Sequence, residues 1–304
     1  MAANGGTKAI LAALGANAGI AVAKFVGFLI TGSSSMLAES VHSVADTSNQ
    51  GLLLLGQRTA KRAATKQHPF GYGRDRYFYS FIVALMLFTL GSVFALYEGV
   101  HKVQHPEDLS SPLVAVAILV VAIALETYSF ATAIKESRAL KGERTWWGFI
   151  RQSKTPELPV VLLEDAGALF GLVFALIGVG LSVVTGDPVW DGIGTLMIGV
   201  LLGMIAITLI IEMKSLLIGE GSGESELATI ERLLAQGDVE RVIHVRTQYI
   251  GPDELLIAAK LAMRTGLGVT EVARAIDDAE RRVRDAVPAA RLMYLEPDLD
   301  RSRV

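Results

Sequence analysis

Cysteine is absent from the 304 residues of this chain. Its absence excludes a disulfide framework and a zinc site built from thiolates, so any metal ion must be held by His, Asp or Glu. Catalytic and nucleotide-binding motifs are missing as well. Without a GxxxxGK loop, ATP is disfavoured as an energy source. Without HExxH, or a Ser or Cys beside a plausible base, a hydrolase is disfavoured too.

A strong net charge is also missing, since the formal value is only −3. Composition therefore gives no argument for a nucleic-acid partner. The N-terminus lacks a basic segment, a short apolar core and a small-residue cleavage site in that order. We therefore expect the first apolar stretch to be a retained helix and not a signal peptide.

Apolar sequence, in contrast, is abundant, with 51% hydrophobic residues and a mean hydropathy of +0.44. Stretches of about 20 residues, the length that crosses a hydrocarbon core, fall at 8–30, 36–56, 77–100, 112–134, 158–184 and 189–213. The sequence thus predicts an all-α transmembrane bundle of six helices.

Lys and Arg are distributed unevenly among the links between these spans. The links 31–35 and 185–189 carry neither, and the link 101–112 carries only Lys102. The links after the second and fourth spans are basic, with Arg58, Lys61, Arg62, Lys66, Arg74 and Arg76 in one and Lys135, Arg138, Lys141, Arg144, Arg151 and Lys154 in the other. The positive-inside rule places both basic links, and both termini, in the cytoplasm. We expect a multi-pass protein of a bacterial-type inner membrane.

A second region begins near Gly219, where the composition becomes that of a soluble domain. Helical spacing of charged residues predicts helices over 224–236 and 269–287. Apolar-rich runs predict strands over 239–250, 254–263 and 290–295, with a turn at 251–253. The order αββαβ indicates a small α+β domain with two helices on one face of a sheet. We divide the chain into a membrane domain, 1–214, and a cytoplasmic domain, 215–304.

Polar side chains line one face of the second span. Glu39, His42, Asp46 and Asn49 occur at i, i+3, i+7 and i+10, positions that share a face of a helix. Ionisable residues in membrane helices are costly and face a bundle interior, where they pair with a partner or an ion. Either a cation site or a cluster of hydrogen bonds between helices accounts for this face.

Adjacent acids, Glu164 and Asp165, stand early in the fifth span. Neighbours on a helix diverge by about 100°, so we expect one to be a ligand, and we favour Asp165. The alternative is that both reach water at the cytoplasmic interface. His42, Asp46 and Asp165 offer a nitrogen and oxygens suited to zinc, with a fourth place for water, Glu164 or Asn49. In the fourth span, Glu126 either relays protons or holds a neighbouring helix.

At these residues the chain resembles the cation diffusion facilitator family. The family's second-helix pattern of His or Asp, three residues, then Asp is matched by His42 and Asp46. In the fifth helix the usual His falls on Val161, and Glu164 is our candidate replacement. The chain resembles the branch with Glu-Asp in that helix and the loop His68-Pro-Phe-Gly-Tyr-Gly-Arg74, which is associated with zinc.

The resemblance implies secondary active efflux of a divalent metal cation in exchange for protons. Zinc is the first choice of ion, with manganese, iron and cobalt left open, and no prosthetic group is expected. A membrane metalloenzyme, or a metal sensor or scaffold, remains as an alternative that would use the same ligands.

The resemblance also implies a copper-chaperone-like terminal domain that holds a homodimer. His244 and Glu296 fall where that domain has metal ligands, but Lys260 occupies a neighbouring position, so we expect dimerisation by packing. His68 is either part of a regulatory metal site or a structural residue of the glycine-rich turn; we favour the turn.

Overall fold

The structure is a computed structural model and describes residues 18–298, apart from the side chains of residues 136, 139 and 140. The described residues form two compact units, and each is treated by itself. One unit comprises residues 18–56 and 78–213, and the other comprises residues 57–77 and 214–298. The basic link after α2 thus belongs to the same unit as the C-terminal region.

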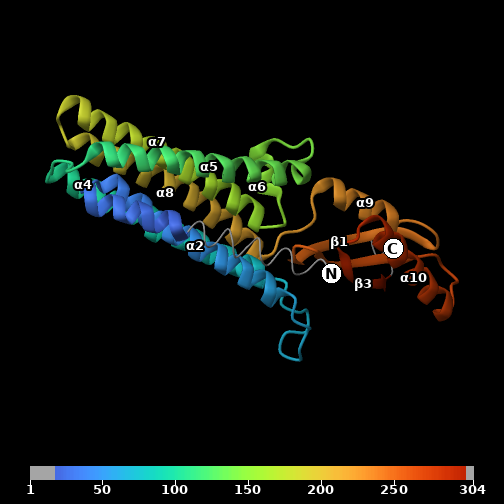
Figure 1. Cartoon of the computed structure of the whole chain (residues 1–304). Coiled ribbons are helices and arrows are strands. Elements are labelled where there is room, and N and C mark those ends of the chain that lie inside the picture. Colours follow the sequence, from blue (N-terminus) through green and yellow to red (C-terminus); the bar gives the residue numbers. More distant parts are fainter. Residues whose placement is uncertain (1–17, 299–304) are drawn as a thin grey trace. The chain divides into compact units, whose positions relative to one another are not determined.

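The first unit is built from long helices (Figure 1). A helical segment, Ala18–Thr31, precedes α2 (Ser34–Ala60), the third span (α3 Asp75–Met86, a π-helical turn η1 Leu87–Val93 and α4 Phe94–Gln104), α5 (Pro112–Lys141), the short α6 (Trp146–Gln152), α7 (Glu157–Thr185) and α8 (Val189–Ile218). Among the described residues, four helical stretches are long and apolar enough to cross a membrane: Asp75–Gln104, Pro112–Lys135, Glu157–Thr185 and Val189–Ile218. The predicted helical architecture is confirmed, with four membrane-capable helices among the described residues, and the count of six spans stays a prediction. Residues 8–17 of the predicted first span lie outside the described residues.

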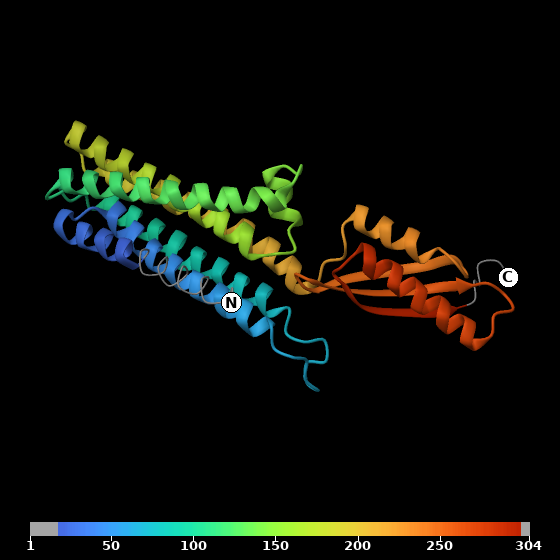
Figure 2. The ribbon, with the colours of Figure 1, turned by 45° about the vertical axis from the view of Figure 1, so that its right-hand side comes forward.

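Close packing holds the third span against α8. A Cβ atom on Gly99 would lie 2.8 Å from Leu196, and one on Gly199 would lie 2.7 Å from Leu96. The Ser92 hydroxyl, in the π-helical turn, donates a hydrogen bond of 2.8 Å to the Gly199 carbonyl. Small residues at such contacts let helix backbones approach closely in a membrane. On the other side, α5 and α7 lie side by side in both views (Figures 1 and 2).

A buried carboxylate ties the start of α2 to the start of α8. Asp191 is fully buried. Its oxygens accept hydrogen bonds from the Ser33 hydroxyl (2.9 Å), the Ser34 backbone N–H (2.8 Å) and the Ser35 hydroxyl (2.6 Å). Because every one of these groups is buried, the carboxylate and its donors satisfy one another where water is excluded.

The C-terminal part of the second unit has the order α9 (Glu224–Leu234), β1 (Val239–Gly251), β2 (Glu254–Met263), α10 (Val269–Ala286) and β3 (Ala290–Asp298). The sheet order is β1-β2-β3, with β1 and β2 antiparallel and β2 and β3 parallel. Alternate residues of β2 enter one apolar core with both helices; its members include Ile230, Leu234, Leu255, Ile257, Leu261, Ala279 and Val283. The prediction of a small three-stranded domain is confirmed.

We expect Asp191→Ala to destabilise the helical unit. The change leaves the buried Ser33 hydroxyl and the Ser34 backbone N–H without their acceptor, at about 1–3 kcal/mol for each unsatisfied group. The Ser35 hydroxyl keeps the Asp191 carbonyl and the Thr195 hydroxyl as partners, each at 3.1 Å. Thermal unfolding of the purified full-length protein in detergent, followed by tryptophan fluorescence, should show a clearly lower midpoint. Asp108→Ala, at an exposed carboxylate, is the matched control, and equal midpoints for the two variants would contradict the role assigned to Asp191.

Candidate metal site

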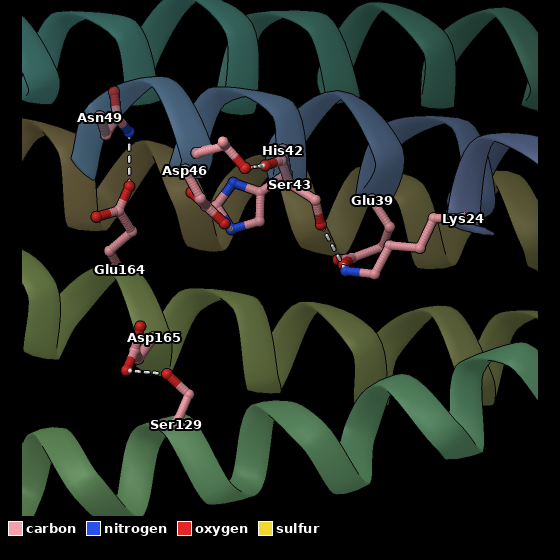
Figure 3. Close-up of polar contacts among 10 residues, drawn as sticks. Lys24, Glu39, His42, Ser43, Asp46, Asn49, Ser129, Glu164 and Asp165 are labelled. Atoms are coloured by element: carbon pink, nitrogen blue, oxygen red, sulfur yellow. Dashed lines mark hydrogen bonds and ion pairs between the residues drawn. The ribbon is translucent and has the colours of Figure 1, made fainter. Parts of the chain in front are cut away.

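The polar face expected on α2 is present and lies deep in the helical unit. Glu39, His42 and Asn49 have no exposed surface, and Asp46 is half-buried. Figure 3 shows the four side chains following one another along α2. Helical periodicity alone places them there, because each is three or four residues from the next.

Several atoms on this face have no hydrogen-bond partner among the described residues. They are Glu39 Oε1, both ring nitrogens of His42, Asp46 Oδ1 and Asn49 Oδ1. The Nε2 atom of His42 lies 3.5 Å from Oδ2 of Asp46, a distance that is too long for a good hydrogen bond. Three of these atoms are oxygen acceptors, and a neutral imidazole adds one acceptor nitrogen. Buried polar atoms are almost always paired, and acceptors on one helix face could bind a cation or an ordered water molecule.

The two neighbouring acids of α7 point in different directions. Glu164 faces α2, where its Oε1 accepts a 2.6 Å hydrogen bond from Asn49 Nδ2, and its carboxyl group also contacts that of Asp46. Asp165 faces α5, where its Oδ2 accepts a 3.0 Å hydrogen bond from the Ser129 hydroxyl (Figure 3). The divergence follows from the turn of about 100° between neighbours on a helix. In this conformation Glu164 is therefore the acid that contacts α2.

A small cavity nevertheless brings both acids together. Its volume is about 20 Å³, and it is lined by Ile20, Ser43, Asp46, Gln50, Glu126, Ser129, Glu164 and Asp165. That volume is the size of a single water molecule or ion. Four carboxyl groups from α2, α5 and α7 thus border one ion-sized space, and Glu126, singled out in the sequence as a buried acid, is among them.

Ligand geometry is incomplete in this conformation. Among the described residues, no three His, Asp or Glu side chains are grouped closely enough to hold a metal ion. His42 reaches the cavity only through Asp46, while Glu164 and Asp165 are bonded to Asn49 and Ser129. Side-chain rotations would be needed to bring the imidazole of His42 and the carboxyl groups of Asp46, Glu164 and Asp165 around one ion.

Sequence reasoning missed one residue of this region, Lys24. It is fully buried in the segment Ala18–Thr31, and its Nζ lies 3.0 Å from Glu39 Oε2. A Cβ atom on Gly171 of α7 would lie 2.5 Å from the other oxygen of Glu39, so a larger residue there would displace this carboxylate from its present position. A lysine in the middle of an apolar stretch was the available signal.

His68 lies in the link between α2 and α3, away from any group that could complete a metal site in the described residues. Its ring packs on that of Tyr72, with the centroids 4.7 Å apart. The backbone turn is closed by a hydrogen bond of 3.0 Å from the Gly71 N–H to the His68 carbonyl, and Gly71 has φ +79°. These contacts fit the interpretation of His68 as a structural residue of a glycine-rich turn, because a positive φ favours glycine.

His244 and Glu296, the candidate ligands of the terminal domain, stand on either side of a lysine. The register pairs His244 of β1 with Lys260 of β2, and Lys260 with Glu296 of β3. Lys260 Nζ lies 2.9 Å from Asp298 Oδ2 and 3.1 Å from Glu296 Oε1. Hydrogen bonds to Asp298 and then to Glu296 raise the pKa of Lys260, so the ammonium group between the candidate ligands stays charged.

Comparison with known proteins adds a family and several relatives. Residues 10–218 match the family model described as "Cation efflux transmembrane domain". The chain is 34% identical over 223 residues to human "Proton-coupled zinc antiporter SLC30A9, mitochondrial", covering 73% of this chain and 39% of that protein. It is 30% identical over 258 residues to "Metal tolerance protein C4" of Arabidopsis thaliana, covering 84% of this chain and 56% of the relative.

A more distant similarity is to "Magnetosome protein MamB" of Paramagnetospirillum magneticum, 24% identical over 268 residues, 86% of this chain and 84% of the relative. The chain spans about two fifths of the length of the human relative and somewhat more than half of the plant one.

We expect His244→Ala to leave zinc binding by the full-length protein unchanged, with an affinity within about threefold of wild type, or about 0.6 kcal/mol. The reason is that Lys260 lies beside His244 and separates it from Glu296. Isothermal titration gives the stoichiometry and affinity, with Asp46→Asn as the variant that should lose affinity. Loss of one bound zinc ion per chain in His244→Ala would show that the terminal domain binds metal.

Proposed function

The chain belongs to the cation efflux family, and on that basis we propose that it carries a divalent metal cation, zinc first, across a membrane in exchange for protons. The supporting observation is the buried face of α2. Five of its nitrogen and oxygen atoms have no hydrogen-bond partner among the described residues, and four carboxyl groups border the cavity beside it. A dication is the substrate that such a set of groups would bind.

The proposed ligands are His42, Asp46, Asp165 and Glu164. One imidazole nitrogen with carboxylate oxygens suits zinc, whereas sites of carboxylates alone suit manganese and magnesium. Asn49 donates a hydrogen bond to Glu164 and is a candidate for an additional ligand. Manganese, iron and cobalt remain competing substrates. Zinc also appears in the name of the mammalian relative.

Coupling to protons follows from the chemistry of these ligands. Carboxyl and imidazole groups bind a metal ion only when they are deprotonated, so loading releases protons and protonation releases metal. Affinity should therefore fall as the pH falls. Glu126 borders the same cavity, which supports a role in carrying protons to and from the ligands, as well as the alternative of holding α5 in place.

We infer the following architecture for transport. Segment 18–31 and α2 complete a six-helix membrane domain with the four apolar spans, and the αββαβ domain, copper-chaperone-like, is cytoplasmic together with both termini. We expect this domain to dimerise by packing, because Lys260 stands between His244 and Glu296 and its positive charge disfavours a shared metal site there. A bacterial-type inner membrane is the expected location, and alternating access would expose the cavity to each side in turn.

A metalloenzyme or a metal sensor would use the same ligands without moving the ion. The sequence contains no HExxH pair, which disfavours a zinc hydrolase. A sensor would bind zinc equally well, so only transport separates it from the proposed function.

We expect zinc influx into proteoliposomes containing the full-length protein to drive proton movement in the opposite direction. His42→Ala and Asp46→Ala should each reduce this exchange by at least about 100-fold, because each removes a ligand from a site with few. An entrapped zinc dye and an entrapped pH dye report the two fluxes. His244→Ala is the matched histidine control. Zinc binding without flux in wild type would indicate a sensor, and retention of more than half the rate in both variants would remove α2 from the mechanism.

The acids of α7 should contribute unequally. We expect Asp165→Asn to abolish zinc binding, because Asp165 matches the family's ligand position and would turn from Ser129 into the cavity. Glu164→Gln should weaken binding and shift its pH dependence, because the amide can still pair with Asn49. Isothermal titration of both variants at several pH values measures this. A larger loss in Glu164→Gln would mean that the conformation with Glu164 against α2 is the metal-bound one.

A further inference from the structure

Lys24 is a buried charge that the proposed exchange does not use. It lies on the face of the segment Ala18–Thr31 that is turned into the bundle, one turn from Ala21 and from Gly27, all three of them buried. A Cβ atom on Gly27 would lie 2.4 Å from Met36, so the segment and α2 are packed closely. An ammonium group in such a place is costly unless it is paired.

The partners of Lys24 belong to the polar face of α2. Its Nζ donates hydrogen bonds to Glu39 Oε2 at 3.0 Å and to the Ser43 hydroxyl at 2.8 Å (Figure 3). The second oxygen of Glu39 has no hydrogen-bond partner among the described residues. Lys24 therefore neutralises Glu39 while leaving one carboxylate oxygen open, one helical turn before His42.

Ser43 connects Lys24 to the acidic cavity. Its side chain accepts the hydrogen bond from Lys24 and also lines the cavity with Asp46 and the three acids of α5 and α7. Lys24 is close enough to act electrostatically on His42, Asp46 and Glu126. Its positive charge thus stands one hydroxyl group away from the space proposed for the metal ion.

We propose that Lys24 is a built-in cation of the transport pathway, which takes the place of a second metal ion at Glu39 and offsets the attraction that the Glu39 carboxylate would otherwise add to the neighbouring site, so that the transported ion can be released. The inference rests on the proposed function, because it needs a dication at His42 and Asp46. The fixed positive charge of Lys24 opposes the attraction of the Glu39 carboxylate for the dication, and charges in the bundle are screened less than charges in water.

A purely structural ion pair would explain less. Two helices are held together at least as well by apolar side chains of similar volume as by a buried ion pair, and the surrounding positions of segment 18–31 are apolar. A purely structural role for Lys24 also leaves unexplained why one oxygen of Glu39, near the proposed metal ligands, has no hydrogen-bond partner among the described residues. If Lys24 is a built-in cation, Glu39 is its ion-pair partner and not a ligand of the transported ion.

Zinc titrations of the full-length protein, using a competing zinc dye, test the proposal with a double-mutant cycle. Wild type should bind one zinc ion per chain. Glu39→Gln leaves the lysine uncompensated and should weaken binding at least about tenfold, whereas Lys24→Met removes the repulsion and should strengthen it at least about tenfold. Lys24→Met/Glu39→Gln removes both charges and should return the affinity to near wild type. Lys24→Arg keeps the charge and should match wild type.

The double variant decides between the readings. If it binds as weakly as Glu39→Gln, Glu39 is itself a ligand and the proposal is wrong. If Lys24→Met binds zinc with unchanged affinity and stoichiometry, the charge of Lys24 has no effect and the proposal is also wrong. Should Lys24→Met fail to fold, the comparison of Glu39→Gln with the double variant still decides. Absence of zinc binding in folded wild type would instead contradict the proposed function.

Discussion

A charged group inside an apolar helix bundle must find its partner within the bundle, because lipid offers none. The described residues meet this requirement in two ways. Asp191 is fully supplied with donors by the serines at the start of α2, and it serves to hold two helices together. His42 and Asp46, a few turns along the same helix, have atoms without a hydrogen-bond partner among the described residues, and these atoms are where we propose that a mobile cation binds.

Helix α2 carries both kinds of polar group, those with hydrogen-bond partners and those without. At 27 residues α2 is long enough to cross a membrane, but its polar face makes it less apolar than the four spans named above. Its first turn is anchored by a carboxylate that is already satisfied, and its middle carries groups that are not. Close glycine contacts join the third span to α8. The proposed site is therefore framed by helices that are joined through contacts involving none of the proposed ligands.

Much of this arrangement could be predicted from periodicity. Spacing of three and four residues is enough to align Glu39, His42, Asp46 and Asn49, and the turn at Gly251 with the alternation in β2 is enough to define the hairpin. The predicted strands 239–250 and 254–263 fall within a residue of β1 and β2. Local rules suffice for these features because each depends on neighbours in the sequence.

Contacts between distant segments could not be obtained in that way. The partner of Lys24 is on another helix, as are those of Glu164 and Asp165, and their choice depends on helix rotation and packing. The grouping of the basic link 57–77 with the C-terminal region is likewise a matter of tertiary contact. Sequence reasoning could name the acids of α7 but not the direction in which each points.

Gly171 has a consequence for how this protein can change over evolutionary time. Because a methyl group there would meet Glu39 Oε1 at 2.5 Å, the glycine, the glutamate and the lysine that pairs with the glutamate form one unit of three helices. A lineage that replaced the glycine by a larger residue would have to move or lose the carboxylate, and a lineage that lost the acid would leave Lys24 without its ion-pair partner. Positions 24, 39 and 171 should therefore vary together among relatives, as a linked set separate from the residues proposed to bind the ion.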